Sequence, residues 1–387
     1  MKFRAVFLDI DDTLFDFRKS SFEALVTAFA ELGVPFTEAD SLALSQLAYA
    51  RMPDNVPRYH ENAETADGMI ATVPIHDLLR AECYDDMFGK VWSPSMNVDL
   101  LRAMSESPRW RNLRVGAYVD EFDAETTKQF SACVFELGNG TLYVAFRGTD
   151  SSIVGWKEDF MMAFRRPVAS QEAAARYLTE LAGHWAGPIM VGGHSKGGNL
   201  AVYAAMNAED DVKDRIERIY SLDGPGFPEA VVNSFEYASV SDRIVKIVPD
   251  SSVVGMVLET PERCIVVKSD VEGIMQHFVF SWQMHGGEFD KVEDVASSSV
   301  TFNKALNKWL ANLSKEQRER AVDALFAVLE ASGAGSISAM MAAGPKVIPE
   351  MLGTYVGLSG EDRRNLNQAL AIMLQAALAR NPKVRRR

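Results

Sequence analysis

Apolar runs and helical patterns alternate through the middle of the chain. β-rich runs at 130–137 and 142–146 flank Gly138-Asn139-Gly140, which predicts a β-hairpin. Further short apolar runs predict strands at 189–191, 218–222, 243–248 and 264–268. Helical patterns lie at 38–49, at 170–185 with Ser170 as its N-cap, and at 199–208. This alternation predicts an α/β fold with a mostly parallel sheet covered on both faces.

From about residue 290 the strand pattern is absent and helical patterns follow one another. One helical face carries five apolar residues: Phe302, Leu306, Trp309, Leu310 and Leu313. Capping residues Ser314 with Gln317, and Ser359 with Asp362, begin two further helices. The apolar stretch 337–358 between them is interrupted by Pro345 and Pro349. We predict a helical C-terminal appendage at 291–387, with a lid or lipid-facing surface as the alternative.

Composition excludes several classes of protein. The chain has 387 residues, 47% hydrophobic and 24% charged, which is typical of a globular protein. A net charge of −13 argues against nucleic acid as a partner, and the basic end 383–387 is expected to be solvated. The three cysteines lack metal-ligand spacing, and no signal peptide or membrane span is predicted, so we expect a cytoplasmic protein. Contact with a lipid surface stays an alternative, and the oligomeric state is not predicted.

The N-terminal segment 1–37 carries a separate motif. A short apolar run leads into Asp9-Ile10-Asp11-Asp12-Thr13, which resembles the D-x-D-x-T motif of the haloacid dehalogenase (HAD) phosphatases. That resemblance implies Asp9 as nucleophile and Asp11 as general acid/base beside Mg²⁺. The second acidic pair that such a metal site needs is missing, because Val254 stands where a carboxylate is required. We therefore expect a fragment of that family with no functional metal site.

The main chemical signal is the stretch 187–201. The apolar run 189–191 meets Gly193-His194-Ser195-Lys196-Gly197, a G-x-S-x-G pattern followed at once by a helix. Strand, sharp turn and helix in this order form a nucleophile elbow, in which small residues on either side of the serine allow close approach. Ser195 is therefore the candidate nucleophile.

A serine nucleophile needs a histidine base, which follows it in the chain in this type of fold. Three of the six histidines precede the elbow, and His194 adjoins Ser195 and cannot easily reach its hydroxyl. Of the two that remain, we favour His277, which comes soon after the last predicted strand. His285, one helical stretch later, is the alternative.

The base in turn needs a carboxylate to orient it. Asp250 ends the second strand after the nucleophile strand and is our choice, with Asp223 at the end of the first as the alternative. Asp242 and Asp270 are further candidates nearby. For the oxyanion hole we expect the Lys196 backbone N–H and Thr149, through its N–H and its hydroxyl, from the loop 146–149.

Several motifs together resemble one family. F-R-G-T at 146–149, W-x-x-D at Trp156 and Asp159, and G-H-S-x-G-G-N-L-A are similar to the fungal-type (class 3) lipases. The likeness is greatest to a bacterial Mbeg-like group, whose D-x-L-x-L-S-Q-L-A-Y, P-D-S-S-x-V-G, Q-H and S-W-Q motifs match 40–49, 249–255, 276–277 and 281–283. Lys196 departs from the lipases, many of which carry Leu or Gln there.

This resemblance extends over about 38–290 and implies an α/β-hydrolase fold. It implies the triad Ser195, Asp250 and His277, with Thr149 in the oxyanion hole and no cofactor. The expected function is a serine hydrolase of carboxylic esters, acting on a small-molecule or lipid ester. The alternatives are a Mg²⁺-dependent phosphatase centred on Asp9 and Asp11, and a non-catalytic interaction protein.

Overall fold

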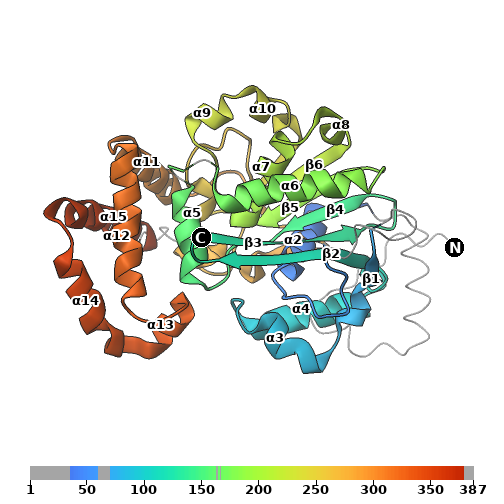
Figure 1. Cartoon of the computed structure of the whole chain (residues 1–387). Helices are drawn as coiled ribbons and strands as arrows, with labels where there is room; N and C mark the ends of the chain where they lie inside the picture. Colours follow the sequence, from blue (N-terminus) through green and yellow to red (C-terminus); the bar gives the residue numbers. More distant parts are fainter. Residues whose placement is uncertain (1–34, 60–69, 163, 166, 379–387) are drawn as a thin grey trace, which may run out of the picture.

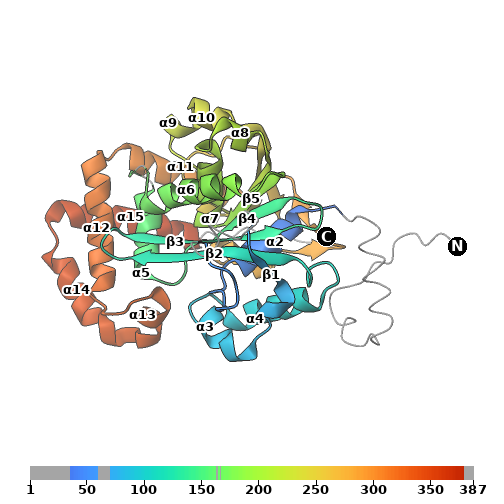
Figure 2. The same ribbon diagram turned by 45° about the vertical axis from the view of Figure 1, so that its right-hand side comes forward.

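The computed structural model describes residues 35–59, 70–162, 164–165 and 167–378. The HAD-like motif at 9–13 and the basic end at 383–387 therefore lie outside the described residues. Within them, the predicted α/β architecture is present as one large sheet with helices on both faces, seen in two orientations in Figures 1 and 2.

The sheet is mixed rather than mostly parallel. Its nine strands run in the order β1-β2-β3-β4-β5-β6-β7-β8-β11. Pairings from β4 to β8 are parallel, whereas β1 to β4 and β8 with β11 pair antiparallel. The strands are β1 (Thr72–Pro74), β2 (Arg114–Asp123), β3 (Lys128–Glu136), β4 (Leu142–Phe146), β5 (Ile189–His194), β6 (Ile216–Leu222), β7 (Ile244–Pro249), β8 (Ile265–Val267) and β11 (Lys291–Val292). A separate hairpin joins β9 (Met284–His285) to β10 (Glu288–Phe289).

Helices cover the two faces of this sheet and extend it at the C-terminal end. The α-helices before residue 290 are α2 (Glu38–Leu47), α3 (Tyr84–Phe88), α4 (Pro94–Glu106), α5 (Ile153–Met161), α6 (Ala169–Gly183), α7 (Lys196–Met206), α8 (Asp210–Lys213), α9 (Glu229–Val232) and α10 (Phe235–Ala238). Single 3-10 turns are η2 (Ile75–Leu78), η3 (Ala81–Cys83), η4 (Ser241–Arg243), η5 (Val254–Met256), η6 (Gly273–His277) and η7 (Val279–Ser281).

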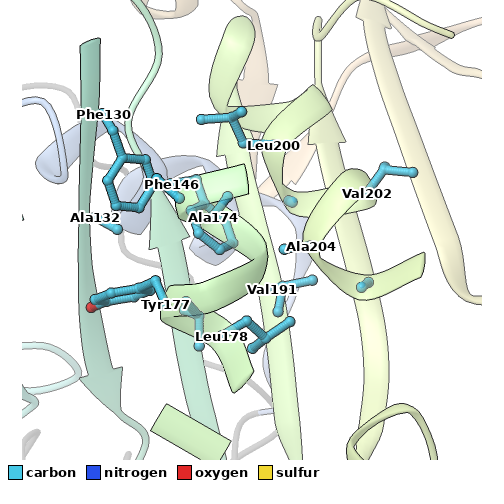
Figure 3. Packing of buried hydrophobic residues seen from close by; sticks show 14 of the residues in the cluster. Phe130, Ala132, Phe146, Ala174, Tyr177, Leu178, Val191, Leu200, Val202 and Ala204 are labelled. Carbon is cyan, nitrogen blue, oxygen red and sulfur yellow. The ribbon is translucent and has the colours of Figure 1, made fainter. Parts of the chain in front are cut away.

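Two hydrophobic layers hold the sheet. On one face α6 and α7 pack against the central strands, where Phe146 and Tyr177 meet edge to face (Figure 3). On the other face α2, α3 and α4 cover β2 to β4 (Figure 1), around the fully buried Tyr143. The hydroxyl of Tyr143 bonds to Ser41 and Ser45 of α2, which satisfies it inside this layer. The sheet is thus buried on both sides, as apolar strand patterns predict.

The N-cap of α6 differs from the prediction. The helix begins after Val168, and Ser170 lies in its first turn. The Gln171 side chain accepts from the Val168 N–H, and Glu158 of α5 accepts from the Ser170 N–H. The orphan N–H groups of this helix are therefore satisfied from within the first turn and by a neighbouring helix. A capping rule that uses only neighbouring residues in the sequence cannot predict Glu158 as a partner.

From Ser297 to Leu378 the described chain is helical. It forms α11 (Ser297–Ala311), α12 (Lys315–Glu330), α13 (Ile337–Ala343), η8 (Gly344–Val347), α14 (Ile348–Gly357) and α15 (Gly360–Leu378), grouped on one side of the sheet domain (Figure 2). The Ser314 and Gln317 capping box is present, and Pro345 and Pro349 begin η8 and α14. Phe326 of α12 packs edge to face on Phe160 of α5, so this group of helices is joined to the sheet domain.

Candidate active site

Ser195 lies at a sharp turn between β5 and α7. Its backbone has φ 59° and ψ −130°, a conformation that L-residues rarely adopt. Gly193 and Gly197 make the turn possible, because a Cβ on either would lie within 2.4 Å and 2.0 Å of the Phe146 carbonyl oxygen. The local geometry is that of a nucleophile elbow, with Ser195 at its tip.

The Ser195 hydroxyl meets a histidine from a distant loop. His277 ends η6, and its Nε2 lies 2.9 Å from Ser195 Oγ. Its Nδ1 lies 2.6 Å from a carboxylate oxygen of Asp223. Since a carboxylate only accepts, Nδ1 carries the proton and Nε2 accepts from the serine hydroxyl. The structure thus brings Ser195, His277 and Asp223 together, in the orientation that a Ser–His–Asp triad requires.

Asp223 follows β6, the strand next to β5, and is fully buried. Its second oxygen accepts from the Ser252 hydroxyl at 2.5 Å and from the Gly255 N–H at 3.1 Å. Burial alone would raise the pKa of Asp223, but His277 and Ser252 outweigh it and the pKa lies below its ordinary value. A Cβ on residue 255 would lie 2.3 Å from this oxygen, so only glycine fits beside the carboxylate.

The choice of Asp250 as partner carboxylate is wrong. His277 Nδ1 bonds to Asp223 instead, and Asp250 Oδ1 is buried with no hydrogen-bond partner among the described residues. The reason is strand order: Asp250 follows β7, which lies one strand further from β5 than β6 does. The 249–255 motif serves the site through Ser252 and Gly255, which hold the carboxylate of Asp223.

His285 lies on the surface and not beside Ser195. Its side chain is 79% exposed and pairs with Asp290 at 2.9 Å, in the hairpin of β9 and β10. In the part of the chain that the structure describes, no group of three or more His, Cys, Asp or Glu side chains could hold a metal ion. Asp9 and Asp11 lie outside that part, so the expectation of no functional metal site there stays a prediction.

The loop that carries His277 is anchored by its neighbour Gln276. The Gln276 side chain accepts from the Ser251 N–H at 2.7 Å and donates to the Val271 carbonyl at 3.0 Å. Its backbone carbonyl accepts from the indole N–H of Trp282 at 2.8 Å. The Q-H and S-W-Q motifs of the sequence therefore have a physical role: they fix the position of the base.

His194 supports His277 from behind. Its Nε2 lies 3.0 Å from the His277 carbonyl oxygen, and its Nδ1 lies 2.9 Å from the hydroxyl of Tyr49. The carbonyl can only accept, so Nε2 donates and Nδ1 accepts from Tyr49. Burial and the neighbouring His277 lower the pKa of His194 to about 3, which keeps this ring neutral. Neither Tyr49 nor this role of His194 was predicted.

The F-R-G-T loop lies against the elbow, close to Gly193 and Gly197. Arg147 is buried and pairs with Asp120 of β2 at 3.0 Å, which anchors the loop to the sheet. Gly148 passes so close to Tyr49 that a Cβ would lie 2.0 Å from its hydroxyl oxygen. The Thr149 hydroxyl donates to both carboxylate oxygens of Asp159 at 2.8 and 2.6 Å. The single proton of this hydroxyl is thus directed at Asp159, and the place of Thr149 in an oxyanion hole stays a prediction.

A family model described as Mbeg1-like matches residues 104–327, and the chain belongs to this family. The resemblance to the Mbeg-like group is thereby confirmed, although the match begins at α4 and ends within α12 rather than at 38 and 290. No curated protein matches the chain. The division into 1–37, 38–290 and 291–387 stays a prediction.

Solved structures of lipases are similar to this chain at low identity. M37 lipase is 17% identical, with 57% of this chain and 70% of that chain covered and a TM-score of 0.35. The Rhizomucor miehei lipase propeptide complex is 18% identical, with 61% and 82% covered and a TM-score of 0.31. Its Ser95/Ile96 deletion mutant is 17% identical, with 66% and 94% covered and a TM-score of 0.34.

The C-terminal region contacts two segments that lie close in sequence to site residues. α15 contacts η6, which carries His277, and Ser336 pairs with Ser152, which follows the F-R-G-T loop. One face of α14 exposes Ile348, Leu352 and Val356. Among the described residues, no helix has both the length and the apolar character to cross a membrane. A role for these helices as a lid or lipid-facing surface stays a prediction.

Proposed function

We propose that the chain is a serine hydrolase of carboxylic esters, built on an α/β-hydrolase fold. The observation that carries this is the continuous chain of hydrogen bonds from Asp223 through His277 to the Ser195 hydroxyl. A carboxylate, a correctly oriented imidazole and a serine on a strained turn together are the requirements for nucleophilic acyl transfer.

In this mechanism His277 Nε2 takes the proton of Ser195 as the hydroxyl oxygen attacks the acyl carbon. Asp223 holds the imidazole in its Nδ1–H form and stabilises the charge that it gains. The backbone N–H of Lys196, at the start of α7, and that of Thr149 would bind the oxyanion. His277 then gives its proton to the leaving alcohol. In the second half of the reaction a water molecule attacks the acyl carbon, His277 takes the proton of the water, and the proton passes to the Ser195 oxygen as the acid leaves.

A fluorophosphonate probe tests this proposal directly, because it labels an activated serine covalently. We expect labelling of the wild-type protein and none of Ser195→Ala, with p-nitrophenyl butyrate hydrolysis lost in parallel. Asp9→Asn should keep both reactions, with or without a Mg²⁺ chelator. An unlabelled, folded wild-type protein would contradict the proposal, and phosphate-ester hydrolysis that Asp9→Asn abolishes would favour the phosphatase alternative.

The ester itself is defined only by class. The acyl chemistry follows from the triad, while the choice between a small-molecule and a lipid ester depends on the shape of the acyl pocket. Rates on a panel of p-nitrophenyl esters of increasing chain length would give that preference.

A further inference from the structure

The Lys196 side chain is buried directly beneath the elbow. Only 1% of it is exposed, although a lysine ammonium is among the groups that are most costly to remove from water. Its Nζ donates to the Gln129 carbonyl at 2.9 Å and to Glu158 Oε2 at 3.0 Å. A second carboxylate, Asp159, lies 3.8 Å from it. One cation therefore faces two adjacent carboxylates of α5.

The two carboxylates have different surroundings. Glu158 is completely buried and accepts from the N–H groups of Gln129 and Ser170 as well as from Lys196. Asp159 has the Thr149 hydroxyl as its hydrogen-bond donor. Glu158 thus connects Lys196 to the body of the protein, whereas Asp159 connects it to the predicted oxyanion loop.

We propose that the Lys196 side chain is a positioning residue of the oxyanion hole, acting through Asp159 on Thr149. This inference depends on the proposed function. Residue 196 then contributes twice to the oxyanion hole. Its backbone N–H binds the oxyanion, and its ammonium group holds the Asp159 carboxylate, which fixes the position of Thr149, the other donor. A buried ion pair is a poor stabiliser compared with apolar groups, so stability alone gives little reason for a lysine here.

Electrostatics explain why the charge matters. Removal from water raises the pKa of Asp159 to about 6, and the charge of Lys196 is the largest opposing influence. Without that charge Asp159 would be protonated more readily, and its O–H would then donate to Thr149 and turn the threonine hydroxyl. An ionised Asp159 without a cation would instead repel the developing oxyanion. The charge of Glu158 raises the pKa of Asp159 further, whereas His277 lowers it.

A double-mutant cycle tests the connection. Lys196→Met would leave Glu158 buried without its cation, so the cycle is made in a Glu158→Gln parent, which removes that charge. The variants add Lys196→Met, Asp159→Asn, or both. The readouts are kcat and KM for p-nitrophenyl butyrate, the rate of fluorophosphonate labelling at Ser195, and the unfolding temperature.

We expect Lys196→Met to lower kcat and the labelling rate by about 30-fold in this parent, with KM changed less than about threefold. In the presence of Asp159→Asn the same substitution should lower them by less than about threefold, because the charge to be balanced is gone. An equal loss in both backgrounds, or a rise in KM with kcat unchanged, would overturn the inference. Absence of labelling in the wild type would overturn the proposed function and this inference together. It is distinguishable from an equal loss in both backgrounds and from a rise in KM, both of which require a labelled wild type.

Discussion

Asp223, which bonds to His277, and Asp159, which bonds to Thr149, differ in almost every respect. Asp223 is completely buried and accepts from three donors: His277, Ser252 and Gly255. Asp159 remains 22% exposed and accepts from the Thr149 hydroxyl, with Lys196 as its nearest cation. The pKa of Asp223 is lowered, and that of Asp159 is raised to about 6.

The more deeply buried carboxylate is therefore the more acidic one. Burial raises the pKa of both groups, but hydrogen bonds to the charged form oppose it, and their number decides the result. Asp223 is held ionised by three donors from two segments, His277 in one and Ser252 and Gly255 in the other, as a carboxylate that must orient an imidazole has to be. Asp159 has fewer donors and depends on a neighbouring charge.

The largest effect on kcat is expected at Asp223, the carboxylate that bonds to His277. Asp223→Asn should lower kcat by about 10⁴-fold, because an amide favours the wrong tautomer of His277. Asp250→Asn should change kcat by less than about threefold, since the base bonds to Asp223 and not to Asp250. Steady-state hydrolysis of p-nitrophenyl butyrate measures both. A larger loss in Asp250→Asn than in Asp223→Asn would reverse the assignment.

A smaller effect is expected on the oxyanion side. Thr149→Val keeps the shape and the backbone N–H but removes the hydroxyl that donates to Asp159. We expect kcat to fall by about 10- to 100-fold, below the 10²- to 10³-fold typical of a lost oxyanion donor. Thr149→Ser, which retains the hydroxyl, is the matched control. A 10³-fold loss in the valine variant would mean that the hydroxyl itself binds the oxyanion.

The smallest effect on activity is expected at His194, which bonds to the backbone of His277. Here the main measurement is the dependence of the unfolding temperature on pH. The pKa of His194 is about 3 in the fold and near 6.5 when unfolded, so only the unfolded chain takes up a proton between these values. The contribution of the neutral His194 to the free energy of unfolding is therefore fully present above about pH 6.5 and is lost as the pH falls toward 3. His194→Gln should reduce the difference in unfolding temperature between about pH 4 and pH 8, with kcat lowered about tenfold.

Tyr49→Phe keeps the ring of His194 and removes only its hydroxyl partner, so it is the control for this experiment. It should retain most of the dependence of the unfolding temperature on pH. A His194→Gln protein with the wild-type dependence would show that another group controls acid unfolding.

Local sequence rules placed the elbow and its base. G-x-S-x-G between an apolar run and a helix predicts the turn. Chain order leaves His277 and His285, and the position of His277 soon after the last predicted strand makes it the favoured histidine. Chain order could not choose between Asp223 and Asp250, because both follow strands and precede the base. The choice depends on which strand lies beside β5, a property of the sheet that no local pattern contains.

The same limit applies to the fold. The hairpin of β3 and β4 carries its turn in the sequence as Gly138-Asn139-Gly140, and it was predicted. The strand β2 was not predicted, although it pairs with β3 along nearly its whole length. With β1–β2, β3–β4 and β8–β11 it makes half of the pairings in the sheet antiparallel, which the alternation of strands and helices further along the chain does not indicate.

Supporting residues were missed for a related reason. Glu158 lies in α5 and Tyr49 in the turn after α2, far in sequence from the residues that they contact at the site. A glutamate in a helix or a tyrosine in a turn carries no local sign of such a neighbour. Lys196 did carry a sign, because a lysine directly after the nucleophile departs from the lipase pattern.

At Ser195 the backbone conformation lowers the stability of the protein, whereas the side chain supplies the proposed nucleophile. Its φ of 59° costs a residue with a side chain about 1–3 kcal/mol, and only glycine adopts such values freely. Glycine at 195 would recover much of that free energy and would remove the nucleophile. Stability alone would thus favour glycine at this position, and a serine at the tip of the turn accords with the proposed use of its hydroxyl.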